Sequence, residues 1–84
     1  MIDKKLHPVE WSEFKYELED ALEHLGDLIK DIEQVPDYHD DTFRVDLGHV
    51  YAHLNRAWRR NAKALKDSDW ELASAFPDDL TPVG

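Results

Sequence analysis

The chain has 84 residues, 42% of them hydrophobic and 11% aromatic, which predicts one small folded domain over residues 1–84 rather than a disordered tail. Its net charge of −9 disfavours nucleic acid and anionic membranes as ligands, and the absence of cysteine excludes disulfides, thiolate metal sites and cysteine nucleophiles. No uncharged apolar run occurs near the start of the chain, so we expect a cytoplasmic protein without a signal peptide or a membrane span.

The first predicted element is an amphipathic helix from about residue 8 to about residue 35. Pro8 suits the first turn of a helix, where its missing N–H needs no partner, and Pro36 ends the pattern. The apolar residues between the two prolines recur at alternating steps of three and four, which is the spacing of a helix that packs in a bundle. They are Trp11, Phe14, Leu18, Ala21, Leu25, Leu28, Ile32 and Val35.

A second helix of the same kind is predicted from about residue 41 to about residue 66. Basic residues fill its last turns, where they complement the helix dipole, and Asp40, Asp41 or Thr42 can cap its start. Only residues 36–39 connect the two helices, so we expect an antiparallel hairpin. The apolar stripe of this helix contains one polar member, Asn61, which we expect to fix the register or the oligomeric state. The stripe consists of Phe43, Leu47, Val50, Leu54, Ala57, Asn61 and Ala64.

A short third helix is predicted from about residue 69 to about residue 75. Ser68 and Glu71 have the spacing of a capping box, and Pro77 ends the helix. Residues 77–84 then form an irregular acidic tail. The predicted fold is therefore all-α: an antiparallel helical hairpin with a short C-terminal helix.

The register of the hairpin follows from placing Val35 opposite Asp40 across the turn. This register forms seven layers, from Trp11 with Ala64 to Ile32 with Phe43, and each layer pairs one residue of each stripe. It also gives the hairpin two edges of different character. The first edge is apolar and carries Leu22, Ile29, Tyr51, Trp58 and Leu65.

An apolar edge of this kind makes the hydrophobic face of each helix too wide for a lone hairpin. Burying one such side chain fully contributes roughly 1.5–3 kcal/mol, so we expect two copies to pair through this edge into a homodimeric four-helix bundle. Gly26 and Gly48 lie beside the edge, which favours close approach of a partner backbone.

The second edge is polar, and its residues face one another across the hairpin. Glu17 is expected to form an ion pair with Arg60. The next levels of this edge pair His24 with His53 and Asp31 with Asp46. A third imidazole, that of His49, lies one helical turn from His53. Such groups at helical spacing are the ligands that zinc, manganese or iron uses in helical bundles. The candidate metal ligands are His24, His49, His53, Asp46 and Asp31.

No nucleophile elbow, phosphate loop or Ser/His/Asp arrangement is visible, so the sequence disfavours an enzyme. The wide apolar face and the acidic tail predict a small acidic interaction or regulatory module that acts through protein–protein contacts, as a homodimer or with another protein partner, and without a cofactor. The alternative is a divalent-metal-binding helical bundle, either a sensor or a metal-dependent hydrolase, that uses the histidines and aspartates of the polar edge.

Overall fold

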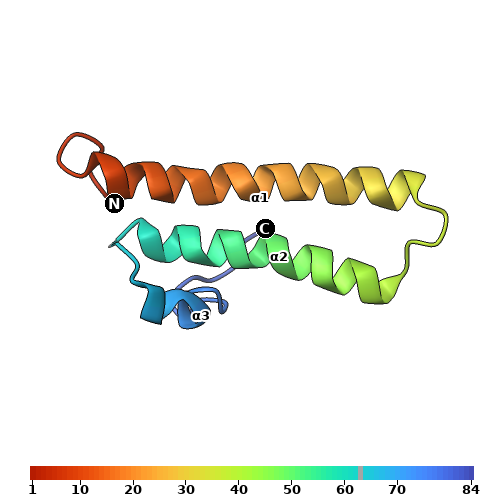
Figure 1. Ribbon diagram of the computed structural model, residues 1–84. Helices are drawn as coiled ribbons and strands as arrows, with labels where there is room; N and C mark the ends of the chain where they lie inside the picture. Colours follow the sequence, from red (N-terminus) through yellow and green to blue (C-terminus); the bar gives the residue numbers. More distant parts are fainter. Residues whose placement is uncertain (63) are drawn as a thin grey trace.

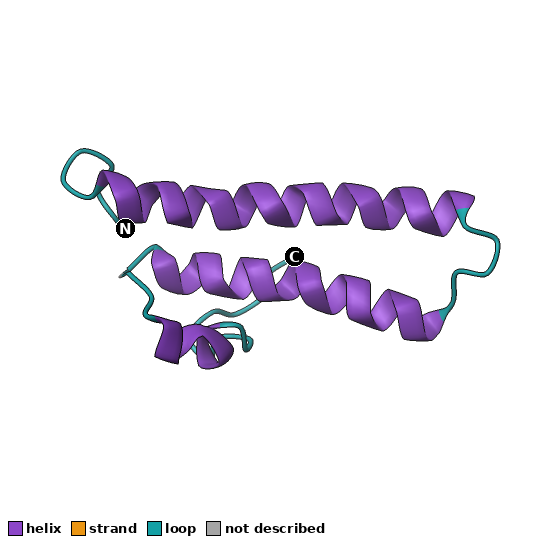
Figure 2. Ribbon diagram, in the orientation of Figure 1, coloured by secondary structure: helices purple, strands orange, loops and turns teal. Residues whose placement is uncertain are grey.

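The computed structural model describes residues 1–62 and 64–84 and contains two long helices and one short helix. Helix α1 spans Pro8–Gln34 and helix α2 spans Asp40–Arg60; a 3-10 turn, η1, spans Asp67–Asp69 and leads into α3, Trp70–Ala73. Figure 1 shows α1 and α2 running antiparallel, with α3 against α2 on the side away from α1. The regular elements of the described residues are all helical, as Figure 2 shows, which confirms the predicted all-α hairpin.

Both ends of α1 agree with the sequence prediction to within one residue. Pro8 occupies the first turn, and the N–H of Val35 donates the last helical hydrogen bond to Asp31 at 2.9 Å. The turn after Val35 is short, and Tyr38 N–H closes it by donating to the Val35 carbonyl. The two helices are therefore antiparallel neighbours, as the length of the connector predicted.

Helix α2 ends at Arg60, whereas the sequence predicted an end near Lys66. In a longer helix the Asn61 carbonyl would accept the N–H of residue 65. Here that carbonyl accepts the N–H of Ile2 instead, at 2.6 Å. The helical ladder already breaks at Ala62, whose N–H donates to the Arg59 carbonyl, while the Asn61 side-chain amide donates to the Trp58 carbonyl. Ala64 and Leu65 lie in irregular backbone. Lys63, also inside the predicted helix, is outside the described residues.

The third helix is a single turn, shorter than predicted. The expected capping box is not formed in the described part of the chain: Asp69 is the N-cap residue of α3 and makes no side-chain cap bond. At the other end, the Ser74 hydroxyl donates to the Trp70 carbonyl at 2.8 Å. Such a turn has too few internal bonds to be stable alone, so its position depends on its contacts with α2.

The faces by which α1 and α2 meet are rotated from the predicted apolar stripes toward the polar edge. Ala21 and Leu28 of α1 and Val50 and Ala57 of α2 are buried, as predicted for stripe residues. Other stripe members remain substantially exposed, whereas polar residues of the edge are buried in their place. The exposed members include Leu18, Leu25, Ile32 and Leu54, and the buried polar residues include Glu17, His53 and Arg60.

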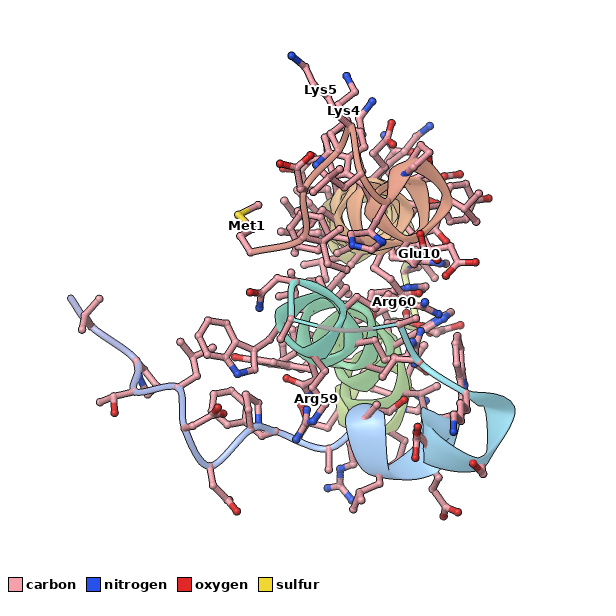
Figure 3. The ribbon with its side chains drawn as sticks, turned by 90° about the vertical axis from the view of Figure 1, so that its left-hand side faces the viewer. Met1, Lys4, Lys5, Glu10, Arg59 and Arg60 are labelled. Atoms are coloured by element: carbon pink, nitrogen blue, oxygen red, sulfur yellow. The ribbon has the colours of Figure 1, made fainter. Side chains whose placement is uncertain are left out.

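Polar side chains of α2 hold the C-terminal segment. The Asn55 amide donates to the Ser74 carbonyl at 2.7 Å, and Arg59 donates to the carbonyls of Ala73 and Ala75 at 3.0 and 2.7 Å. Figure 3 shows Arg59 pointing toward this segment. These bonds satisfy carbonyls that the single turn of α3 leaves without helical partners.

The segment beyond α3 continues to the apolar edge of α2. The Trp58 indole N–H donates to Asp79 at 2.9 Å, and the rings of Tyr51 and Phe76 lie 6.4 Å apart. The tail therefore covers part of the edge that the sequence assigned to a partner. In the described part of the chain, no helix combines the length and hydrophobicity needed to cross a membrane.

Two glycines inside the long helices yield a stability prediction. A Cβ added at Gly26 or at Gly48 would meet no atom within 4 Å, so alanine fits at both positions. We expect Gly26→Ala and Gly48→Ala each to raise the free energy of unfolding by about 1 kcal/mol, because alanine favours the helix. Urea denaturation measures this change. A lower free energy of unfolding in either variant would contradict open space at that position and would indicate the close partner backbone that the sequence predicts there.

Candidate functional site

Three histidines meet on the polar edge of the hairpin. His24 comes from α1, while His49 and His53 lie one turn apart on the facing side of α2. The ring centroids are separated by 4.1 Å between His24 and His49, 5.1 Å between His24 and His53, and 4.8 Å between His49 and His53. One ring nitrogen from each residue lies within 4.8 Å of the other two. The structure thus brings together the three histidines that the sequence singled out.

The three imidazoles differ in their access to solvent. His53 is buried, with 6% of its surface exposed, whereas His24 is half-buried and His49 is exposed. Their planes are inclined by 16° to 39° to one another, so the rings are partly stacked. The cluster has one fixed member in the hairpin interior and two members that can turn toward solvent.

The two candidate carboxylates lie beside the histidines, in a cavity of about 200 Å³. Asp46 accepts a hydrogen bond of 2.7 Å from the hydroxyl of Tyr38. Burial and this bond, with the charges of Asp46 and Asp31, raise the pKa of Tyr38 to about 12. Asp31 and Asp46 are not part of the group of close ligand atoms that the imidazoles form. The cavity is lined by His24, Asp27, Leu28, Asp31, Asp46 and His49.

Tyr38 is a polar partner that the sequence reasoning missed. It lies in the connector between the helices, and its reach to Asp46 depends on the path of that turn. Helical periodicity carries no information about such a path. The only sequence signal was a tyrosine placed within a short turn next to an acidic helix start.

A buried ion pair adjoins the histidine cluster. Arg56 Nε donates to Glu17 Oε2 at 2.7 Å, and each of these two residues is only 5% exposed. The predicted partnership of Glu17 with Arg60 is therefore wrong by one helical turn. Arg60 contacts Glu13 instead, with 3.0 Å between Nη1 and Oε2. With Val35 opposite Asp40, Glu17 lies level with residue 58, midway between Arg56 and Arg60, so either arginine can reach it. The contacts of Arg56 with His53 and Trp70 favour Arg56 as the partner.

The same arginine connects the histidine cluster to the C-terminal segment. Arg56 Nη2 lies 3.2 Å from His53 Nδ1, and Arg56 Nη1 donates to the Ser74 hydroxyl at 2.7 Å. The guanidinium also lies over the Trp70 ring, 4.0 Å from its centroid. Arg56 thus contacts α1, the histidine cluster and α3 at once.

The two ring nitrogens of His53 have different surroundings. An arginine can only donate, so Nδ1 is the acceptor in the contact with Arg56. Nε2 is buried and has no hydrogen-bond partner among the described residues. Burial lowers the pKa of His53; the Glu17 carboxylate opposes this effect, and Arg56 and His49 add to it. His53 is therefore held as a neutral imidazole with one unused nitrogen.

The other side of the hairpin carries an open apolar face. We use this name for eight large apolar side chains of α1 and α2 whose exposed fractions range from 38% for Phe43 to 73% for Leu22. They are Leu18, Leu22, Leu25, Ile29, Ile32, Phe43, Tyr51 and Leu54. Figure 3, viewed along the hairpin, shows Met1 on the side opposite Glu10. Met1 borders the open apolar face, since it lines one apolar cavity of about 460 Å³ together with Leu18 and Leu54.

The predicted interface residues divide into two groups. Leu22, Ile29 and Tyr51 belong to the open apolar face. Trp58 and Leu65 are half-buried, the former against the tail and the latter beyond the end of α2. The C-terminal tail thus occupies the end of the predicted interface nearest the chain termini and leaves the rest open.

Comparisons with protein-family models, curated proteins and solved structures give no match to this chain. Its function must therefore be inferred from the two features above, the histidine cluster and the open apolar face.

The buried ion pair generates a stability prediction with an internal control. Glu17→Gln leaves the Arg56 charge buried without its partner, which should lower the free energy of unfolding by about 3–5 kcal/mol. Glu19→Gln removes the exposed Lys15–Glu19 pair, 3.9 Å apart, and should cost less than about 0.5 kcal/mol. Urea denaturation compares the two variants. Equal losses would contradict the assignment of Arg56 to Glu17.

The lowered pKa of His53 predicts how stability changes with pH. Unfolded histidine takes up a proton near pH 6.5, whereas folded His53 stays neutral to lower pH. The unfolded state therefore binds more protons in that interval, and stability should fall as the pH drops below about 6.5. Carboxylates titrate mainly below this window. Urea denaturation of metal-free protein at several pH values should give a flatter profile for His53→Gln, and identical profiles would contradict the prediction.

Proposed function

We propose that this protein is a small helical interaction module that works as a homodimer, in which two hairpins pack their open apolar faces together into a four-helix bundle. The observation that carries the proposal is the open apolar face itself. Its eight side chains belong to the regular three-and-four stripes and their flanks, yet the hairpin leaves them substantially exposed. A surface of this kind on a small helical protein is typical of an interaction site.

The size of the face fits a second protein chain. An aromatic side chain offers roughly 150–250 Å², and the leucines and isoleucines that form most of the face lie toward the lower end of this range. With the observed exposed fractions, the eight residues present roughly 600–800 Å², which is close to the roughly 800 Å² that one partner contributes to a standard interface. This area supports a stable protein–protein contact rather than scattered surface residues.

The pattern of the face favours a second copy of the same chain. A two-fold interface needs one surface that is complementary to itself. The open apolar face follows steps of four and three from Leu18 to Ile32 of α1 and is widened by side chains of α2, so a second hairpin offers a face of the same length. All eight of its members are uncharged, so two acidic chains can approach through it while their charged surfaces point away.

The position of the hairpin contact also supports a bundle. Each helix of a four-helix bundle buries two flanks, one toward each neighbour. In this hairpin, the flank of α1 that carries Ala21 and Leu28 is buried against α2, and the flank that carries Leu22 and Ile29 is free. The free flank is where the second neighbour of a bundle would lie.

The dimer is tested with one pair of matched variants. Leu22 and Val45 have similar exposed fractions, 73% and 70%, but Val45 is not a member of the open apolar face. Two copies of Leu22 would be buried in the dimer, at about 1.5–3 kcal/mol each, so Leu22→Lys should raise the dissociation constant at least about 100-fold. Val45→Lys should leave it unchanged.

Analytical ultracentrifugation over a range of concentrations measures the dissociation constant, and circular dichroism checks that both variants stay helical. A wild-type monomer at high micromolar concentration would overturn the homodimer. An equal effect of the two lysine substitutions would place the interface elsewhere on the molecule.

A further inference from the structure

We propose that His24, His49 and His53 together bind one divalent transition-metal ion of the zinc type. The proposal is independent of the homodimer, because all three residues belong to one chain and lie on the polar edge rather than on the open apolar face. Imidazole nitrogen is a preferred ligand for zinc, copper and nickel, whereas calcium and magnesium prefer oxygen. A set of three imidazoles therefore favours zinc, copper or nickel over calcium and magnesium.

The buried nitrogen of His53 is the observation that distinguishes this cluster from a chance grouping of surface histidines. Nε2 of His53 lacks a hydrogen-bond partner in the described part of the chain, although the residue is 94% buried. Leaving a buried polar atom unsatisfied costs roughly 1–3 kcal/mol. A metal ion that His53 bound through Nε2 would satisfy that atom.

Small side-chain movements would complete the site. The closest set of ligand nitrogens lies within 4.8 Å, whereas nitrogens around a tetrahedral zinc with bonds of about 2.0–2.1 Å are about 3.3 Å apart. The rings are partly stacked, and a metal lies in the plane of each ring that binds it, so the rings must turn about their Cβ–Cγ bonds. His49 is exposed and His24 is half-buried, which leaves them free to turn toward the fixed ring of His53.

Glu17 is placed to act as a positioning residue for His53. Its Oε1 lies 3.7 Å from His53 Nδ1. When Nε2 binds a metal, Nδ1 must carry the proton of the neutral ring, and metal-bound histidines usually donate that proton to a carboxylate or a carbonyl. Metal binding would therefore exchange the present contact, in which Arg56 donates to Nδ1, for one in which Nδ1 donates to Glu17.

Three protein ligands leave at least one coordination position for water. His24 and His49 also line the cavity that contains Asp31 and Asp46, so the carboxylates lie beside the ligands rather than among them. In this arrangement they would accept hydrogen bonds from metal-bound water, while Asp46 keeps its bond to Tyr38.

Isothermal titration of the full chain with zinc chloride near pH 7.5 tests the site. We expect one zinc per chain. His24→Gln and His49→Gln remove ligands that are not fully buried, so both variants should stay folded, as circular dichroism will verify. Each should weaken zinc binding by more than the roughly 10–100-fold that loss of an outer-shell partner costs.

The remaining two histidines provide a matched control. His7 and His39 are exposed and lie outside the cluster, so a His7→Gln, His39→Gln double variant should bind zinc with unchanged affinity. Equal weakening in this variant, or unchanged binding in His49→Gln, would overturn the proposal. A stoichiometry of one zinc per two chains would also overturn it, because the site would then lie between copies.

A second readout reports on His53 without changing the sequence. Nitrogen-15 NMR of the imidazoles distinguishes the two neutral tautomers. We expect the proton of His53 on Nε2 in the metal-free protein, where Arg56 donates to Nδ1, and on Nδ1 after one equivalent of zinc is added. An unchanged tautomer after zinc binding would exclude His53 Nε2 as a ligand.

Discussion

The buried pair of Arg56 and Glu17 is the interaction on which the rest of this structure depends. A guanidinium in the interior must satisfy its N–H groups, since a buried charge without partners is strongly destabilising. Arg56 does so with partners from α1, α2 and the C-terminal segment, namely Glu17, His53 and Ser74, and its planar face lies over Trp70. Such a set of contacts tolerates little change in geometry. It therefore determines how α1 is turned relative to α2 and where α3 lies.

The exposure of the open apolar face follows from the same buried pair of Arg56 and Glu17. Helix α1 carries apolar residues over a wider arc than a single neighbour can cover, so the buried pair decides which part of the arc is used. Turning Glu17 inward keeps Ala21 and Leu28 buried but leaves Leu18, Leu25 and Ile32 of the same stripe substantially exposed. The small side chains of Ala21 and Ala57 suit this contact, because they let the backbones approach where polar side chains fill the adjacent edge. The exposed leucines and isoleucines are thus a consequence of polar burial in a helix with an over-wide apolar face.

The sequence was sufficient to predict features that depend on local periodicity. The bounds of α1 and the antiparallel connection follow from proline positions and the three-and-four spacing, and both agree with the structure. The neighbourhood of His24 and His53 could be predicted because the connector fixes which turns of the two helices share a level. Features that depend on one contact between distant segments could not be predicted. At the early end of α2, the Asn61 side chain donates to the Trp58 carbonyl and the Asn61 carbonyl accepts the N–H of Ile2, and periodicity predicts neither bond.

The exchange of ion-pair partners has a similar origin. A register along the axis is one parameter of a hairpin, and the rotation of each helix about its own axis is another. Alternating apolar residues determine the axial register well. They determine the rotation of each helix poorly when the apolar arc is wide. Glu17 could face Arg56 or Arg60 at nearly the same register, and only the environment of Arg56, with His53 beside it and Trp70 above it, decides between them.

The two proposed activities would reinforce each other through this rotation. A metal held by His24, His49 and His53 would join the middle of α1 to the middle of α2 on the polar edge, because one ligand comes from the first helix and two from the second. It would replace the contact of Arg56 with His53 and hold the helices at the rotation that the contacts of Arg56 with Glu17 and Ser74 favour. A ligand that binds only this folded arrangement adds its binding free energy to the stability of the hairpin. The side chains of the open apolar face would then be presented in a fixed geometry, and docking a second copy would require less ordering of the two helices.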